Sequence, residues 1–577
     1  MRLLPSRSAI RIAVLAFIAA LLLWLPAFRF PFATGFGDWQ FFMHMWEAGY
    51  VAVMRYGEWP LWDPFHCGGI TIFGNPQNQL WSPLFLIALL VGPTLATKIF
   101  VVVHAWAGLA GMYMLARRHG LGLPAALLSA LAWAASGFFV WHVSTGHSAF
   151  LPFYFAPWVL LAVRAAMRDI RYAAALAALL TLVLLEGGVY PLPFFVVLIA
   201  FDALIRLTDR KQRQPLLAAG LVGTVLFVCM AAVRLWPILD ELQRSPRTMP
   251  SRDGVSLSEI IVMLTAREHA WRLSGHEFVW SEYGNYVGWG VCTLALLGAL
   301  SSWRRGSRFG SGCGSASWLL GALVFLALLS GDHGPMSAWS LLHRLPIYDS
   351  LRVPSRFCVL FTLYLSLLAG CGVDAVNRLV AASRPLSKYI AHSAPAWTLL
   401  LAIAIDLLWV QYPTLDKWHY EPIRSDWQSA NFYFSNQSYG DVYASLPRMN
   451  LGSRDCYEAM NFSPARGLWS GDKPQARVLG GRGAVGPVLR TTSHAFFDVT
   501  LDEPARVLVN HNYAPGWESN AGRVVSDRGR LAIDLPSGSQ HVELSYRPSI
   551  LWPCVALSLV GLALALALAR YGNRAAR

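Results

Sequence analysis

The chain has 577 residues, of which 55% are hydrophobic and only 14% charged, and its formal net charge is +14. Apolar runs near the roughly 20 residues that cross a bilayer exclude an ordinary soluble protein and indicate a polytopic α-helical membrane protein. Lys and Arg stand in short clusters between these runs rather than on one soluble domain, so no nucleic-acid partner is expected.

The apolar runs predict about twelve transmembrane helices. Their approximate ranges are 11–29, 97–116, 123–142, 150–166, 172–188, 190–206, 215–236, 287–303, 315–330, 355–373, 395–411 and 550–570. With twelve crossings every basic cluster falls on one side, which the positive-inside rule makes the cytoplasm, and both termini are then cytoplasmic. The stretch 81–95 is short and contains Pro83 and Pro93, so it is expected to be an interfacial or re-entrant helix.

This topology places loops 30–96, 237–286 and 331–354 of a membrane domain (1–411) on the outer face. Segment 412–549 is also outside and is rich in Asn, Ser, Gly and Asp. Alternating strand patterns occur in it at 496–501, 506–509, 530–533 and 541–546. These patterns predict an extracytoplasmic β-sandwich-like domain, followed by a last helix and a cytoplasmic tail (550–577).

Two of the eight cysteines, Cys67 and Cys456, are expected on the outer, oxidising face. A disulfide between them would hold the C-terminal domain over the first loop, but the sequence sets no distance between them and leaves their pairing open. No Cys or His spacing is typical of a zinc site.

A series of short stretches is more informative in its order than any one of them alone. The stretches are Gly57 to Gly69, Asn75-Pro76-Gln77, Trp81 to Leu84, Ala126 to Gly137 with His147, Trp236 to Arg247, Glu282 to Gly288, Leu351 to Phe357 and Asn512 to Trp517. Together, over nearly the whole chain, they resemble the YfhO-type family of bacterial GT-C membrane glycosyltransferases.

The resemblance implies a transferase that takes a sugar from a polyprenyl-phosphate donor. It would modify an envelope lipid, glycan or polymer on the outer face of the bacterial inner membrane, in contact with membrane lipid. The sugar and the acceptor do not carry over. Many relatives look longer, with more membrane spans, so roles that depend on those extra elements do not carry over either.

Asp38 is the candidate base for the acceptor hydroxyl. It lies in Gly37-Asp38-Trp39, about ten residues beyond the first span, where a lipid-borne donor would meet water. The alternative is a helix cap, since Asp is a preferred capping residue. Asp63, between Trp62 and Pro64, is the second candidate, although an Asp-Pro pair also commonly begins a turn.

The departing lipid phosphate needs cationic partners, because its charge grows as the glycosidic bond breaks. Arg352 and Arg356 lie four residues apart at the outer mouth of a span, on one face if the helix has begun, and Arg234 ends another span. The alternatives are that the two arginines snorkel at the interface or pair with Asp349, and that Arg234 pairs with a nearby acid.

Further residues are candidates for substrate binding. They are His147, Trp39, Trp62, His66, Glu241 and Tyr283. A lone His between spans is more often structural, and interfacial anchoring explains Trp without a ligand. No cofactor is expected. Outer-face acids could hold Mg²⁺ or Mn²⁺, but the first loop has no Asp-x-Asp motif, so a metal-independent mechanism is expected.

Two other classes of function fit the same hydropathy. A transporter or flippase for lipid-linked glycans predicts a continuous polar path across the bilayer, whereas a transferase predicts a cavity open to the outer face and to lipid. A non-catalytic envelope assembly protein would depend on segment 412–549 and not on Asp38.

Overall fold

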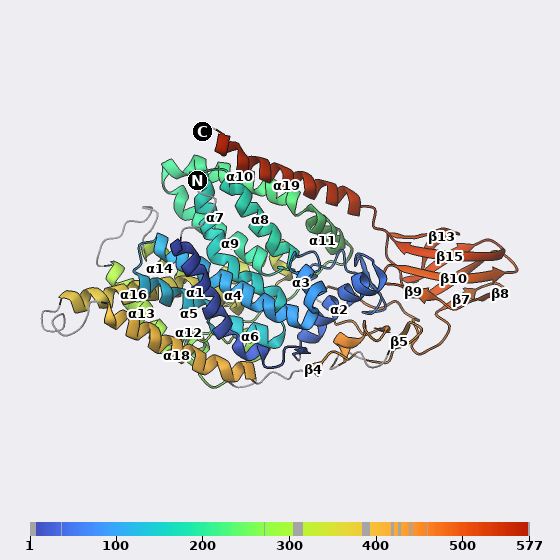
Figure 1. Cartoon of the computed structure of the whole chain (residues 1–577), viewed down its shortest axis with the longest axis horizontal. Helices are drawn as coiled ribbons and strands as arrows, with labels where there is room; N and C mark the ends of the chain where they lie inside the picture. Colours follow the sequence, from blue (N-terminus) through green and yellow to red (C-terminus); the bar gives the residue numbers. More distant parts are fainter. Residues whose placement is uncertain are drawn as a thin grey trace.

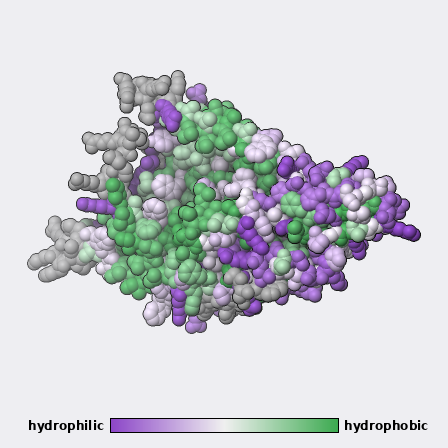
Figure 2. Space-filling view, turned by 45° about the vertical axis from the view of Figure 1, so that its right-hand side comes forward, coloured by the Kyte–Doolittle hydropathy of each residue, from purple (hydrophilic) through white to green (hydrophobic). Residues whose placement is uncertain are grey.

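A computed structural model of the chain describes residues 7–35, 37–269, 272–303, 315–382, 393–416, 421–424, 428–437, 440, 442–457 and 460–574. A body of packed helices carries a β-sandwich at one end, and the last helix runs back along the body from the sandwich (Figure 1). Apolar residues cover much of the helical body, whereas the surface of the sandwich is mostly polar (Figure 2).

A helix lies in each of the twelve apolar stretches of the sequence. These helices are α1 (Arg7–Leu23), α4 (Pro93–Arg118), α5 (Leu123–Ala134) with α6 (Gly137–Thr145), the 3₁₀ helix η2 (Ser148–Phe155) with α7 (Ala156–Arg168), α8 (Tyr172–Leu185), α9 (Pro191–Leu207), α10 (Arg210–Met230), α13 (Gly288–Trp303), α14 (Ser315–Leu329), α16 (Cys358–Ala382), α18 (Ala394–Asp416) and α19 (Leu551–Arg574). Among the described residues, seven helical stretches are long and apolar enough to cross a membrane. The chain is therefore a polytopic helical protein, and the count of twelve crossings stays a prediction.

Shorter helices fill the segments between the apolar ones. They are η1 (Leu25–Phe28), α2 (Trp39–Tyr56), α3 (Phe85–Val91), α11 (Ala232–Arg244), α12 (Leu257–Thr265), η3 (Trp280–Glu282), α15 (Ala338–Leu342), η4 (Tyr348–Ser350), η5 (Pro354–Phe357) and η6 (Tyr443–Ser445). The seven residues of α3 agree with a helix too short to span within 81–95.

Helix α2 is an element that the sequence analysis did not predict. Most of its residues are buried, and it ends at Gly57, whose φ of 66° lies in the left-handed region that favours glycine. Its buried polar side chains have partners outside the helix: His44 contacts Asp63, and Glu47 pairs with Arg448. The helix is thereby enclosed by the first loop and by the chain around η6.

Helix α16 packs against α5, α13 and α14 in the core of the helical body. Gly372 allows the close crossing with α13, since a Cβ there would lie 2.0 Å from the carbonyl oxygen of Leu294. Because η5 leads directly into α16, this packing also fixes the position of η5.

The sandwich consists of two antiparallel sheets. Its strands are β7 (Ala476–Leu479), β8 (Gly483–Val485), β9 (Leu489–Arg490), β10 (His494–Leu501), β11 (Ala505–Asn512), β12 (Trp517–Ser519), β13 (Arg523–Asp527), β14 (Arg530–Leu535) and β15 (Gly538–Tyr546). One sheet has the order β12-β15-β10-β8 with β9 beside β10, and the other has the order β13-β14-β11-β7. All four predicted strands are confirmed, and inward residues of both sheets, such as Phe497, Val507, Ile533 and Val542, form one buried core.

The chain before the sandwich packs on the helical body. The strands β5 (Tyr433–Ser435) and β6 (Leu451–Ser453) pair in parallel, and β1 (Ala33–Thr34) pairs with β4 (Glu421–Pro422). Phe434, Ala444 and Leu468 belong to the core of the body rather than to that of the sandwich. The sandwich therefore begins near Ala476, well after the predicted boundary at 412.

The first loop joins the two parts of the molecule. Its hairpin of β2 (Trp62–Asp63) and β3 (Ile70–Thr71) inserts Trp62 among Trp517 and Tyr546 of the sandwich core. The Trp62 indole N–H donates to Nε2 of His511 at 3.1 Å. Trp62 was predicted to bind substrate, but it is only 1% exposed and serves as a core residue of the sandwich.

A disulfide and an ion pair reinforce this junction. Cys67 in the first loop is bonded to Cys456, which decides the pairing that the sequence left open. Glu58 accepts from the Nδ1 of His494 at 2.8 Å, from the hydroxyl of Thr492 at 2.8 Å and from the backbone N–H of Ser493 at 3.0 Å. These contacts fix the sandwich against the loop that follows Asp38 and α2.

Candidate functional site

A cavity of about 520 Å³ lies where the first turns of α2, η2, α9 and η5 meet. Its lining residues are Asp38, Phe41, Phe42, Gln77, His147, Phe150, Tyr190, Pro246, Arg247, Thr248, Met249, Arg352, Arg356, Cys456, Tyr457, Met460 and Asn461. The cavity brings together the predicted base Asp38, the predicted phosphate ligands Arg352 and Arg356, and His147. Its size is that of a small-molecule site.

Asp38 occupies the N-cap position of α2, yet its side chain makes no capping hydrogen bond. One carboxylate oxygen lies 2.9 Å from Nε2 of His147, and the other accepts from the hydroxyl of Tyr457. Burial opposes ionisation of this carboxyl, but the contacts with His147 and Tyr457 outweigh it and hold the Asp38 pKa below its usual value. The charged side chain is thus directed to the cavity and does not satisfy the helix end.

The turn that presents His147 depends on Gly146. Its φ of 101° lies in the left-handed region, and a Cβ there would lie 2.0 Å from the backbone nitrogen of Trp39. The chain of α6 can therefore pass directly against the start of α2, where the Asp38 N–H donates to the carbonyl of Thr145 at 3.0 Å. This close approach puts the imidazole beside the Asp38 carboxylate.

Arg356 is held by Glu282 in a buried bidentate ion pair. Its Nε and Nη2 donate to the two carboxylate oxygens at 2.8 and 2.6 Å, and both side chains are at most 6% exposed. Its guanidinium also lies over the rings of Tyr190, at 4.3 Å, and Phe150, at 4.9 Å. Burial opposes ionisation of Glu282, but the charge and hydrogen bonds of Arg356 together with the neighbouring imidazoles outweigh it and lower the Glu282 pKa, so this carboxylate is ionised. Because Glu282 neutralises it, Arg356 has less free charge for an anion.

Arg352 is the more available of the two cations. Among the described residues it forms no ion pair, with Asp349 or with any other acid, and its guanidinium lies 5.4 Å from the ring centre of Phe278. Arg352 and Arg356 were expected on one helical face if the helix had begun at residue 352. That condition is not met, since residue 352 lies between η4 and η5 and only residue 356 lies in a helix. Both residues still line the cavity, although only Arg356 lies in the 3₁₀ helix that Pro354 begins.

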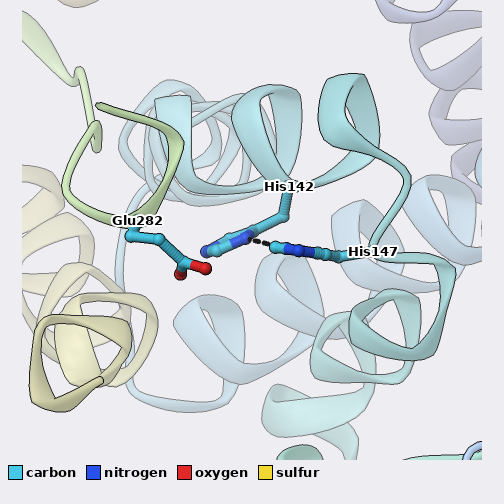
Figure 3. Close-up of side chains that lie close together, drawn as sticks. All are labelled: His142, His147 and Glu282. Atoms are coloured by element: carbon cyan, nitrogen blue, oxygen red, sulfur yellow. Dashed lines mark hydrogen bonds between the residues drawn. The ribbon is translucent and has the colours of Figure 1, made fainter. Parts of the chain in front are cut away.

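Among the described residues, His142, His147 and Glu282 are the group whose arrangement most resembles a metal site. One ligand atom from each lies within 4.8 Å of the others, and the three side chains converge (Figure 3). The Nδ1 atoms of the two imidazoles are 2.7 Å apart, as in a hydrogen bond, and both oxygens of Glu282 already accept from Arg356. Two nitrogen donors with one committed carboxylate do not match the oxygen ligands that Mg²⁺ and Mn²⁺ prefer.

The second candidate base and the third candidate phosphate ligand lie elsewhere. Asp63 is 1% exposed, contacts Nε2 of His44 at 3.1 Å and accepts from the N–H of Phe65, as in an Asx turn. Arg234 is fully buried and donates to the carbonyls of Phe73, Asn75 and Asn78 in the first loop. Neither residue lines the cavity; both hold the loop in place.

Four of the remaining predicted substrate ligands are likewise outside the lining. The Trp39 indole donates to the Val143 carbonyl at 2.8 Å, and Tyr283 donates to Asp253 at 3.0 Å. His66 contacts the hydroxyl of Tyr443. Glu241 lies 3.9 Å from Arg244 and lines a separate small pocket beside the sandwich. All four are buried structural residues in this fold.

Other residues, which either line the cavity or, like Glu282, hold a lining residue, were not predicted as site residues. Glu282 and Arg247 stand in stretches that carry the family resemblance, so a signal for them existed. Tyr457 had no signal of its own, but its neighbour Cys456 did, because pairing with Cys67 brings position 457 to the first loop. Tyr190 belongs to an apolar run and gave no indication of a site.

No protein-family model matches the chain, and no curated protein is significantly similar to it in sequence. Solved structures that resemble it include the arabinofuranosyltransferase AftD from mycobacteria, at 16% identity and a TM-score of 0.49 over 94% of this chain. This chain spans 40% of AftD. ArnT from Cupriavidus metallidurans, bound to undecaprenyl phosphate, matches at 14% identity and a TM-score of 0.42, over 76% of this chain and 75% of ArnT. At these values the likeness assigns no activity to this chain.

Proposed function

We propose that this protein is a membrane glycosyltransferase of GT-C type that moves a sugar from a polyprenyl-phosphate donor to a hydroxyl of an envelope lipid, glycan or polymer. The observation that carries the proposal is the convergence of Asp38 with Arg352, Arg356 and Arg247 around one cavity. The donor class comes from the sequence resemblance to the YfhO-type family. The bacterial inner membrane is the proposed location.

In the proposed reaction, Asp38 acts on the acceptor and the arginines act on the donor phosphate. The acceptor oxygen attacks the anomeric carbon of the donor, and its proton passes to the Asp38 carboxylate. The bond between the anomeric carbon and the phosphate oxygen breaks, and its electron pair remains on the lipid phosphate. Arg352, which has no acidic partner among the described residues, would stabilise that growing charge, with Arg247 on the same wall.

The carboxylate of Asp38 suits the role of base in its charge state and its setting. A lowered pKa keeps it ionised at neutral pH, and the contact with His147 fixes its orientation. The imidazole of His147 is in turn fixed by His142. His147 and Tyr457 are therefore proposed as positioning residues for the base. Phe41, Phe42 and Tyr190 provide apolar and aromatic surface for the sugar or the first isoprene units.

Envelope glycans compared by mass spectrometry test this proposal. A deletion strain is expected to lack one sugar, which wild type restores and Asp38→Asn does not, because an amide cannot accept the proton. The matched control is Asp498→Asn, which removes an 84% exposed carboxylate on the sandwich. All variants are compared at equal amounts in the membrane fraction.

If Asp38→Asn or Asp38→Ala restored the sugar fully, Asp38 would not be the base. An unchanged glycan profile in the deletion strain, with loss of a transported lipid-linked glycan from the outer leaflet, would favour a flippase. Function that survives Asp38→Asn but not deletion of residues 476–546 would favour an assembly protein.

A further inference from the structure

A second cavity, of about 350 Å³, lies between the C-terminal ends of α4, α7 and α9 and the start of α10. Five cations line it: Arg118, Arg164, Arg168, Arg206 and Lys211. They come from three of the basic clusters that the positive-inside rule assigns to the cytoplasm. The proposed transfer reaction does not use this cavity.

The positive charge of the second cavity is only partly balanced. Asp202 is shared by two of the five cations, since its oxygens accept from Arg164 at 2.8 Å and from Arg206 at 2.6 Å. Arg118, Arg168 and Lys211 form no ion pair among the described residues, and all three are exposed at the rim. A cavity with this excess of guanidinium and ammonium groups suits a phosphate group.

The second cavity lies one bilayer thickness from the first. The helical stretch Ser148–Arg168 has 21 residues, eight in a 3₁₀ helix and 13 in an α-helix. At about 2.0 and about 1.5 Å per residue, respectively, it is roughly 35 Å long, enough to cross a hydrocarbon core of about 30 Å. His147 and Phe150 at its start line the first cavity, and Arg164 and Arg168 at its end line the second. A ligand of the second cavity is therefore bound at the opposite membrane surface.

The neighbourhood of the cavity favours a lipid over free phosphate. Leu115, Leu161 and Pro215 line it alongside the cations, so acyl carbons would find apolar contacts next to the charged groups. Helix α10 exposes Leu217 and Leu221 on its outer face, and only 22% of its apolar window is buried. The cavity thus borders a helix face suited to contact lipid.

We propose that this cavity binds the phosphate headgroup of an anionic phospholipid from the cytoplasmic leaflet. The positive-inside rule requires only cations in cytoplasmic loops. Here five cations from four helices line one cavity, an arrangement that suits a lipid headgroup. A bound headgroup would join the ends of these helices and balance the charge that Asp202 leaves uncompensated.

Native mass spectrometry of the delipidated full chain tests the proposal. The probes are phosphatidylglycerol, phosphatidylcholine with the same acyl chains, and inorganic phosphate. We expect wild type to bind phosphatidylglycerol on the order of tenfold more tightly than phosphatidylcholine. The triple variant Arg118→Gln/Arg168→Gln/Lys211→Gln is expected to lose this preference.

The control triple variant is Arg117→Gln/Arg210→Gln/Arg213→Gln. It removes the same charge from two of the three clusters, but none of its three residues lines the cavity. The control is expected to bind phosphatidylglycerol within about twofold of wild type. If the cavity triple variant does not fold, Lys211→Gln compared with its neighbour Arg210→Gln makes the same distinction.

Three results would overturn the proposal. Equal loss in both triple variants would mean that the lipid is held by diffuse surface charge. Binding of inorganic phosphate as tight as that of phosphatidylglycerol would make free phosphate the ligand. Loss of phosphatidylglycerol binding in Arg352→Gln, with the cavity triple variant unaffected, would place the lipid in the first cavity.

Discussion

Glu282→Gln is expected to destabilise the protein strongly, because it leaves the guanidinium of Arg356 buried without a counter-charge. The ion pair is bidentate, at 2.6 and 2.8 Å, and its side chains are 5% and 6% exposed. Breaking one side of such a pair costs about 3–5 kcal/mol, since the remaining ion keeps its desolvation penalty and loses its partner. Contacts of Arg356 with the rings of Tyr190 and Phe150 recover only part of that cost.

The assay is the free energy of unfolding in lipid bicelles for Glu282→Gln, Arg356→Gln and the double variant. The double variant is expected to be at least about 1 kcal/mol more stable than the sum of the single effects predicts, because it leaves no buried ion. As a control, Asp169→Asn removes one partner of a partly exposed ion pair with Arg171 and should change stability by less than about 1 kcal/mol. Additive effects of Glu282→Gln and Arg356→Gln, or a stable Glu282→Gln variant, would refute the reasoning.

Three further predictions concern the residues around the junction. Tyr457→Phe removes a hydrogen bond that favours the ionised form of Asp38, so the Asp38 pKa should rise. The acidic limb of the pH profile of kcat/KM should then move to higher pH. An unchanged limb would contradict Asp38 as the base. Cys456→Ser should lower stability by about 2–5 kcal/mol, and peptide mapping of wild type without reductant should recover the peptides of Cys67 and Cys456 linked; unlinked peptides would contradict the disulfide. The pKa of Glu58 is lowered to about 2, because contacts with the sandwich outweigh burial. The stability that ionised Glu58 adds should therefore be present above pH 4.5 and fall as the pH drops toward 2. Limited proteolysis should release the sandwich of wild type in that window, and the Glu58→Gln variant should already be more sensitive to protease at pH 7.

The two cavities lie at opposite ends of α7 and α9. Between them, Val159 of α7 and Leu198 of α9 are fully buried apolar residues, and Phe194 stacks on Phe357 with ring centres 3.8 Å apart. These residues fill the space along α7 and α9 with packed apolar side chains. A flippase would need a continuous polar path across the bilayer, and Val159, Leu198, Phe194 and Phe357 do not supply one.

Single residues show where prediction from the sequence reached its limit. Asp38, His147, Arg352 and Arg356 were predicted from their positions at the ends of apolar runs, and they line one cavity. Trp62 of the first loop was predicted as an aromatic substrate-binding residue and lies in the sandwich core instead. Residues of one loop share their sequence context, and the context does not tell which side chains turn to a cavity and which turn to another domain.

The sequence by itself determined the apolar helices and the four longest strands of this protein. A helix of about 20 apolar residues and a strand of alternating residues are set by the length and period of a local pattern, which is why α4, α16, β10 and β15 lie where the pattern predicts them. Only the tertiary structure decided the site. The contacts between Asp38 and Tyr457 and between Arg356 and Glu282 join positions 419 and 74 residues apart. Such contacts depend on how helices cross and loops close, and these are properties of the packed chain as a whole.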